Sequence, residues 1–470
     1  MASAALAGAA DAGWAELPVS LLLEVFGYLP FKNLARCCRV CCAWRRLALR
    51  GPCWSLFVYE GSMFTRRKFT THAGWQSLMD HYKLRLLVSH KAASWRQLVI
   101  KPANMLFNLY EFMRVLTNFT EYHASAEEGR QALAAVSSFE FMWQLHFQLA
   151  GQEHPVAYGT GGLVLKTLGT LLSHMRGLRF LALRHLQLND NEADEFLTDI
   201  LLESFQERLR MLSLRNLTQS RKPLMQLGLF VALEKLVVSP QHLDDDTVAL
   251  LGCLTLLRSL VVIQDEKTTG AEAVSRATWR KFAMSSKCEA KVHLVFRGRL
   301  RGDGFAWQPG APVRSIVDDS PSTALTSADV DIVIDNYAAS LVDFRQRGLP
   351  RRFGSRRFAN RLDASFAAMT RSCVLLREVA IRERLSTGTL IYMAAFLHEQ
   401  CGFHVRRNAL LKRRDWTSAP GGLSAAFFKR LSVDCRSVDA TSASVGQLLR
   451  RRWTPLADSE YVGRFPVGVT

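Results

Sequence analysis

The 470-residue sequence is short of acidic side chains and contains no uninterrupted apolar run of membrane-spanning length. We therefore expect no membrane partner. The chain has 42 acidic residues against 60 basic ones, and its formal net charge of +18 favours an acidic partner, which could be nucleic acid, anionic lipid or an acidic protein. Hydrophobic residues make up 49% and charged residues 22%, a globular balance that excludes disorder of the whole chain.

The usual signatures of catalytic and metal sites are also missing. The 12 histidines form no pair at metal-ligand spacing with a carboxylate, and the sequence contains no nucleophile elbow. Cys37, Cys38, Cys41 and Cys42 share one helical pattern, so their thiols would splay over adjacent faces and not converge on a tetrahedral zinc ion. We expect no catalytic site, no metal and no cofactor.

The ten cysteines are scattered, and residues 1–13 are alanine-rich without the basic region of a signal peptide. We therefore expect residues 1–13 to be a disordered tail and the thiols to be free in a reducing compartment. The expected location is the cytoplasm, the nucleus or both.

Two short helical patterns follow the tail. Leu17-Pro18 precedes a run of apolar residues at helical spacing that ends at Pro30, and a second run ends with a large aromatic residue, Trp44. The two or three short helices that this predicts, in about forty residues, are too small to bury their apolar surface alone. Docking on a partner helix surface would cover it, and an ordinary helical hairpin packed on its own chain is the alternative.

The order of these apolar residues resembles an F-box over residues 14–56. The residues that carry the resemblance are Leu17, Pro18, Leu21, Leu22, Val25, Phe26, Leu29, Leu34, Val40, Cys41 and Trp44. In that family the module docks on a Skp adaptor, which joins it to a cullin scaffold in an SCF-type ubiquitin ligase. The resemblance implies that these residues form the adaptor contact or its supporting core. Val19-Ser20 stands where an acidic pair often follows Leu-Pro, which removes a favourable charge from the positive end of the first helix dipole.

A template then recurs along the chain: an apolar residue, two of any type, an apolar residue, one of any type, and an apolar residue. Its copies begin at Trp95, Leu178, Leu209, Leu233, Leu257, Leu376 and Phe428. The four central copies are 31, 24 and 24 residues apart, close to the period of leucine-rich repeats. Chance in a leucine-rich chain is the alternative for single copies. The loop position that usually holds Asn or Cys does not do so here, so the repeats are degenerate.

The predicted fold class is therefore α/β, with a small N-terminal helical F-box followed by a curved, degenerate leucine-rich-repeat-like solenoid. We expect the repeat domain to occupy residues 57–300 and 328–450. Glycine and proline indicate a loop or hinge over residues 301–327, interrupted by a short strand at Val313 to Val317. Residues 451–470 are expected to be an irregular tail.

The position just past the template's last apolar residue is basic in several copies. It holds Lys101, Arg184, Arg215 and Arg382. Because side chains alternate along a strand, residues on this side face away from the buried ones. A column of cations there would bind an acidic or phosphorylated protein segment by charge-assisted hydrogen bonds, whereas the alternative is a set of solvated strand-end charges.

Resemblance to F-box proteins with a leucine-rich substrate domain implies a non-catalytic, substrate-recognition subunit of a ubiquitin ligase. Such a receptor acts by proximity, raising the effective concentration of substrate lysines near the conjugating enzyme. The competing hypothesis is a scaffold or nucleic-acid-binding repeat protein outside a ligase. It relies on basic runs with aromatic neighbours, at Arg66 to Lys68, Arg351 to Arg357 and Lys412 to Arg414, and is the less favoured of the two.

Overall fold

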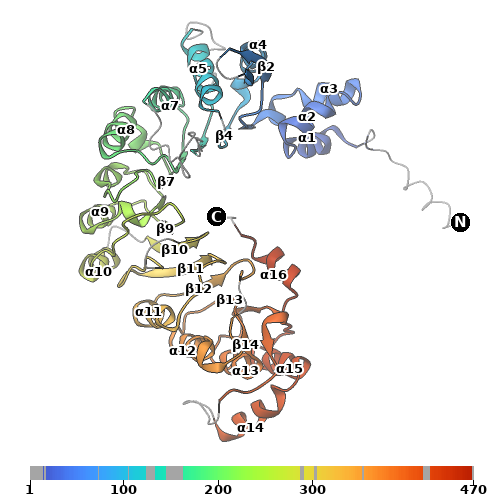
Figure 1. Cartoon of the computed structure of the whole chain (residues 1–470), viewed down its shortest axis with the longest axis vertical. Helices are drawn as coiled ribbons and strands as arrows, with labels where there is room; N and C mark the ends of the chain where they lie inside the picture. Colours follow the sequence, from blue (N-terminus) through green and yellow to red (C-terminus); the bar gives the residue numbers. More distant parts are fainter. Residues whose placement is uncertain are drawn as a thin grey trace, which may run out of the picture. The chain divides into compact units, whose positions relative to one another are not determined.

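The computed structural model contains two compact units, Met1–Gln219 and Ser220–Thr470, and each is described by itself (Figure 1). The described residues are 14, 17–71, 74–103, 105–122, 133–143, 162–285, 290–300, 304–351, 354–416 and 424–467. The expected tail at residues 1–13 lies outside them. The boundary between the units falls at Gln219, whereas the sequence placed the break of the repeat domain at residues 301–327.

Unit 1 begins with three short helices: α1 (Val19–Gly27), α2 (Phe31–Cys37) and α3 (Cys42–Ala48). They are followed by a 3-10 turn over Gly51–Trp54. Pro18 and Pro30 stand directly before α1 and α2, where a missing N–H costs nothing. Cys41 caps the N-terminus of α3, because its Sγ accepts a hydrogen bond from the Trp44 N–H.

The rest of unit 1 is a parallel sheet joined by helices. In spatial order its strands are β1 (Leu56–Tyr59), β4 (Gln97–Ile100), β5 (Ser138–Met142), β6 (Phe180–Arg184) and β7 (Met211–Arg215). The helices are α4 (His81–Lys91), α5 (Leu106–Tyr122), α7 (Leu163–Ser173) and α8 (Asp190–Leu202). Figure 1 shows α5, α7 and α8 along one face of these strands.

Strand register explains the core of unit 1. One column across the sheet consists of Phe57, Leu98, Phe139, Leu181 and Leu212, all buried and paired in register. The template copies at Trp95, Leu178 and Leu209 end in β4, β6 and β7, as expected. The strands β1 and β5 were not expected, although they follow the same template, as Trp54-Phe57-Tyr59 and Val136-Phe139-Phe141.

A two-stranded antiparallel hairpin stands between β1 and α4. Its strands are β2 (Thr65–Thr70) and β3 (Gly74–Met79). The basic run Arg66 to Lys68 is exposed on β2. Phe69 and Trp75 are paired across the two strands, with their ring centroids 5.7 Å apart, and both side chains are exposed.

Unit 2 repeats the parallel architecture. Its strands in spatial order are β8 (Lys235–Val238), β9 (Ser259–Gln264), β10 (Lys291–Arg297), β11 (Val313–Asp319), β12 (Asp343–Gln346), β13 (Glu378–Ile381) and β15 (Gly402–Val405). The helices are α9 (Asp245–Leu251), α10 (Arg276–Met284), α11 (Ser327–Tyr337), α12 (Asp363–Ser372), α13 (Thr387–Ala394), α14 (Ala425–Asp434), α15 (Val438–Leu448) and α16 (Asp458–Arg464). A separate parallel pair is formed by β14 (Leu385–Ser386) and β16 (Leu410–Leu411).

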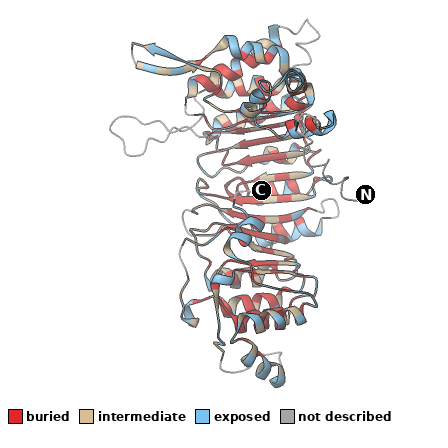
Figure 2. Cartoon of the chain, turned by 90° about the vertical axis from the view of Figure 1, so that its right-hand side faces the viewer, coloured by how far each residue is buried: buried red, intermediate tan, exposed pale blue. Residues whose placement is uncertain are grey.

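The core of unit 2 is again a set of apolar columns in register. One column runs through Val238, Val262, Leu294, Ile316, Phe344, Val379 and Phe403. All of these side chains are buried, and Figure 2 shows the strands as largely buried ribbons. The α/β class is thus confirmed, while the leucine-rich-repeat-like solenoid stays a prediction. No helix among the described residues is long and apolar enough to cross a membrane.

Three stretches differ from the expectation. The supposed loop at residues 301–327 contains β11, a member of the main sheet that extends two residues beyond the expected short strand. The supposed irregular tail contains α16, which is held by the buried side chain of Tyr461. The template copy at Phe428 lies in α14, because Phe428 and Leu431 also fit helical spacing.

Buried charges fasten the ends of the strands in unit 2. The Arg382 guanidinium, which is 1% exposed, bonds the Asp318 carboxylate at 2.8 Å. It also donates to the backbone carbonyls of Asp318, Ser320 and Arg347 at 2.9–3.1 Å. Arg406 in turn donates to the Arg382 carbonyl at 3.0 Å. One arginine thus satisfies the polar groups at the ends of β11 and β12, which explains how Asp318 is buried there.

We expect Arg382→Met to lower the free energy of unfolding of unit 2 by about 3–5 kcal/mol, because it leaves a buried carboxylate without its partner. Burial raises the pKa of Asp318 and Arg382 opposes that shift, so the variant raises it further. A carboxyl group whose pKa is higher in the folded than in the unfolded state lowers the free energy of unfolding at pH values above its unfolded pKa. This destabilisation disappears as the pH falls and the group becomes protonated. The difference in free energy of unfolding between Arg382→Met and the wild type should therefore narrow from pH 7 to about pH 4.

Urea unfolding followed by tryptophan fluorescence at several pH values measures this gap. Arg371→Met on α12 is the matched control, since it removes an exposed arginine. Equal unfolding curves for the two variants would show that the Arg382 ion pair does not support the fold.

Candidate functional site

The apolar residues expected to bind a partner divide into a buried and an exposed set. Leu22, Phe26 and Leu34 are buried, whereas Leu17, Leu29 and Trp44 are half-buried. The exposed set consists of Pro18, Leu21, Val25, Val40 and Cys41. The buried set can form only the supporting core, so the exposed set is the candidate contact surface.

Aromatic contacts fix the buried set. The Phe26 ring on α1 meets the Trp44 ring on α3 edge-to-face, with centroids 5.2 Å apart. Trp54 Nε1 donates to the Ala48 carbonyl at 2.9 Å, which ties the end of α3 to the following turn. Arg45 Nε donates to the Cys38 carbonyl at 2.9 Å and closes the turn between α2 and α3. These contacts hold the three helices as one small unit.

The exposed set includes an apolar stripe on α1. Leu21 and Val25 lie four residues apart, and Tyr28 follows directly after the helix, so the three fall at helical spacing. Leu21 is 48% and Val25 39% exposed. Val40, after α2, adds another exposed apolar side chain. Apolar groups arranged in this way on a short helix are typical of a protein-binding surface.

The start of α1 carries no charge to strengthen this surface. Its first turn contains no acidic residue, and Pro18 provides no side-chain cap. The consequence expected from Val19-Ser20 is therefore present in the structure. No acidic side chain therefore complements the helix dipole at the start of α1.

The helices are joined firmly to the first strand of the sheet. The Phe31 ring contacts the rings of Trp54, Phe57 and Phe64, with centroids 5.6–6.3 Å apart. Lys91 Nζ, at the end of α4, donates to the Leu49 carbonyl at 2.6 Å and lies 5.3 Å from the Trp54 ring. Within unit 1 the exposed surface on α1 therefore keeps a definite orientation relative to the sheet.

The cysteines of this region act as small side chains in the structure. Cys37, Cys38, Cys41 and Cys42 are free thiols, and the Cys41 sulfur is engaged as the helix cap of α3. Burial raises the pKa of the Cys37 thiol. Within the ranges that the structure describes, no three metal-ligating side chains gather into a cluster.

The predicted basic column is largely paired within the chain. In unit 1, Lys101 Nζ lies 3.0 Å from Glu60, and Arg184 lies 3.0 Å from Glu140. Arg215 is buried. In unit 2, Arg382 is the buried partner of Asp318. These ion pairs could not be predicted from the sequence, because Glu140 lies on β5, an unexpected strand, and Asp318 lies just past the short strand expected within the loop at residues 301–327.

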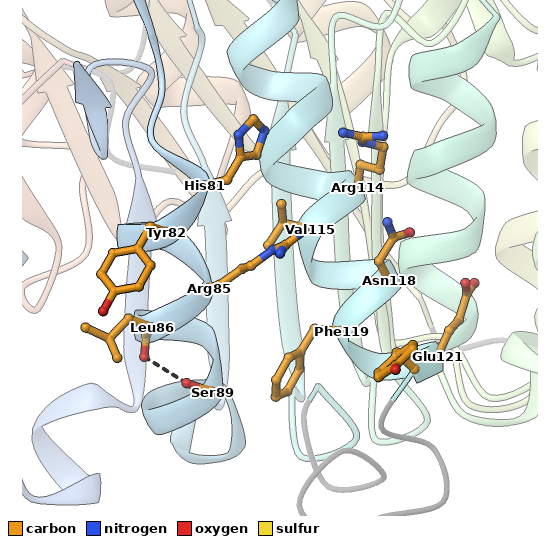
Figure 3. Close-up of a pocket in the computed structure, with 11 residues that line it drawn as sticks. His81, Tyr82, Arg85, Leu86, Ser89, Arg114, Val115, Asn118, Phe119 and Glu121 are labelled. Carbon is orange, nitrogen blue, oxygen red and sulfur yellow. Dashed lines mark hydrogen bonds between the residues drawn. The ribbon is translucent and has the colours of Figure 1, made fainter.

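A hollow of about 900 Å³ in unit 1 lies between α4 and α5 (Figure 3). Two residues of its lining, His81 and Arg114, bond the buried carboxylate of Glu111 at 2.5 Å and 2.7 Å. The lining also contains the aromatic residues Tyr82, Phe119 and Tyr122. The Ser89 hydroxyl donates to the Leu86 carbonyl, so it is engaged within its own helix. The hollow is suited to binding a mixed polar and aromatic group, and no residue of it was selected from the sequence.

The two sets on α1 should respond differently to truncation. We expect Phe26→Ala to lower the free energy of unfolding by about 3–5 kcal/mol, because it empties a buried site. Leu21→Ala should change it by less than about 0.5 kcal/mol, since that side chain faces solvent. Thermal and urea unfolding of both variants measure the difference, and equal destabilisation would mean that Leu21 belongs to the core.

Comparison with known families gives one match to this region. A family model described as F-box-like matches residues 14–58, close to the predicted boundary at residue 56. No curated protein matches the chain. F-box domains bind Skp-type adaptors, so the match suggests an adaptor-binding role for this segment. The chain therefore carries an F-box-like domain at its N-terminal end, and the exposed stripe on α1 belongs to it.

Proposed function

We propose that this protein is the substrate-recognition subunit of an SCF-type E3 ubiquitin ligase. The observation that carries the proposal is the exposed apolar stripe on α1, within a segment that matches the F-box-like family. In this role the F-box-like domain docks on a Skp adaptor, and the adaptor joins it to a cullin scaffold. The protein itself performs no chemistry and works in the cytoplasm, the nucleus or both.

Adaptor docking would bury the side chains that the free protein leaves in solvent. Leu21, Val25 and Tyr28 would enter a groove of the adaptor as helical anchors. Because α1 has no acidic residue in its first turn, the contact would depend on apolar burial and change little with salt. A few such anchors normally carry most of the binding free energy of an interface.

The parallel-sheet domain would hold the substrate. Ubiquitin transfer then depends on proximity, because the receptor raises the local concentration of substrate lysines near the conjugating enzyme. A receptor of this kind needs a stiff connection between its two binding surfaces. The contacts of Phe31 and Lys91 supply stiffness between the F-box-like helices and the sheet of unit 1.

Co-expression with a Skp adaptor tests the proposal. We expect the wild-type chain to form a stable complex at moderate salt, and Leu21→Ala with Val25→Ala to weaken binding about tenfold or more while leaving the melting temperature unchanged. The matched control is Leu163→Ala with Leu202→Ala, which shortens exposed leucines on α7 and α8. A wild-type chain that is soluble alone and ignores the adaptor would refute the proposal.

The exposed hairpin favours a second candidate function, the binding of single-stranded nucleic acid. Arg66, Arg67 and Lys68 supply positive charge on β2, and Phe69 and Trp75 offer exposed aromatic rings beside them. Basic residues combined with stacking rings bind single strands without sequence preference. This surface is separate in sequence from the stripe on α1, so the two functions can be tested independently.

Titration with a labelled single-stranded oligonucleotide at several salt concentrations tests the second candidate. Phosphate-dominated binding should fall log-linearly with salt, and Phe69→Ala with Trp75→Ala should cost about 1–3 kcal/mol per stacked base. The same double variant should bind the adaptor as the wild type does. Absence of oligonucleotide binding by the wild type at low salt would eliminate this candidate.

A further inference from the structure

Unit 2 contains a basic pocket that neither candidate function uses. It has a volume of about 480 Å³ and lies where β12 and β13 meet the end of α16. Its lining consists of Arg345, Arg347, Glu378, Gly463, Arg464, Phe465 and Pro466. In Figure 1, α16 stands on the side of the unit 2 sheet away from α11 and α12.

The strand residues of this pocket point away from the helical face of the sheet. Phe344 is buried and its ring contacts Phe366 of α12, so the next residue on β12, Arg345, projects from the opposite face. Arg345 pairs in register with Ala380 of β13, and Asp343 pairs with Glu378. The paired strands therefore fix the guanidinium of Arg345 and the carboxylate of Glu378 as neighbours.

The other wall of the pocket is equally fixed. The hydroxyl of Tyr461, on α16, donates to the Gln346 carbonyl at 2.6 Å. The Gly348 N–H donates to the Phe465 carbonyl at 3.2 Å. Arg406 is bonded to Asp458, the first residue of α16, at 2.9 Å. These bonds place Arg464 beside the strand ends, so the pocket is built before any ligand arrives.

Positive charge exceeds negative charge in the lining. Three arginines face one carboxylate, and the Nε of Arg345 is buried without a hydrogen-bond partner. Arg345 lies 3.5 Å from Asp343, a long ion pair. Burial lowers the pKa of Arg347, and the like charges of Arg345 and Arg297 lower it further against the opposing charge of Asp319. A bound anion would relieve this repulsion.

We propose that this pocket binds an oxyanion presented by a protein partner, through Arg345, Arg347 and Arg464. The anion is a phosphorylated side chain or a side-chain carboxylate, since guanidinium groups form paired, charge-assisted hydrogen bonds with both. This pocket would serve the proposed substrate receptor as a binding site. Only the identification of the partner as a ligase substrate rests on the proposed function. The residues differ from those of the basic column expected from the sequence, which are paired or buried.

Glu378 sets the charge preference of the pocket. Its carboxylate lies 3.4 Å from His404, and burial raises its pKa while Arg345 and Arg464 oppose that shift. Burial and the charges of Arg464, Arg451 and Arg345 lower the pKa of His404 to about 4, so this imidazole is neutral at pH 7 and does not offset the negative charge of Glu378. Because Glu378 repels an incoming anion, Glu378→Gln should tighten anion binding, a gain that a folding defect cannot imitate.

The experiment measures the melting temperature of the full chain in increasing inorganic phosphate and in chloride at equal ionic strength. We expect a saturable rise with phosphate for the wild type, an apparent affinity about tenfold weaker for Arg464→Gln, and a tighter one for Glu378→Gln. Arg280→Gln on α10 is the control, because it removes an exposed arginine and reports the general stabilising effect of phosphate. Arg347→Gln provides a second loss variant within the pocket.

Two further probes distinguish the source of the anion. A stronger response to O-phosphoserine than to glutarate indicates a phosphorylated side chain, and an equal response indicates an acidic one. Phosphate responses of Arg464→Gln and Glu378→Gln that match the control would overturn the proposal. The variant with Leu21→Ala and Val25→Ala should keep the phosphate response, so failure of adaptor binding and failure of this pocket are separate outcomes.

Discussion

Parallel pairing is the constraint on which the rest of this structure depends. A parallel strand cannot return through a tight turn, so each segment needs a crossover that carries it back to the start of the next strand. In both units this pairing aligns residues of neighbouring strands, and it builds apolar columns such as Phe57 to Leu212 and Val238 to Phe403. Side chains on the other face of the strands are thereby released from the core and become available for ion pairs and binding.

The ends of the strands present a second requirement, because their backbone groups would otherwise be buried without partners. Unit 2 meets it with charged side chains. Arg382 bonds carbonyls after β11 and β12 together with the Asp318 carboxylate, and Arg406 connects the Arg382 carbonyl to α16. Guanidinium groups thus satisfy backbone carbonyls at these strand ends. The same arrangement fixes α16, and α16 completes the basic pocket with Arg464.

Neighbouring residues of the F-box-like domain are divided between its core and its exposed surface. On α1 the core is held by Leu22 and Phe26, whereas Leu21 and Val25 remain exposed one residue away. Because the helix is anchored through Trp44 and the sheet junction through Phe31, an exposed apolar surface is maintained without collapse of the small unit. This division allows the surface to be altered while the fold is retained, and it supports the proposed role in adaptor docking.

The sequence by itself determined the features that depend on local spacing. Residues 14–56 and the template strands β4, β6 and β7 were predictable, because helical spacing and strand alternation appear directly in the order of residues. Tertiary structure decided the rest. Asp318 and Asp319 resemble loop residues until Arg382 and Arg297 are brought beside them, which is why the expected strand ended at Val317 whereas β11 continues to Asp319. Likewise, Lys101 and Arg184 resemble a free basic column until Glu60 and Glu140 lie within 3.0 Å. The sequence shows that a charged side chain is present, but its ion-pair partner comes from a distant segment that only folding brings close.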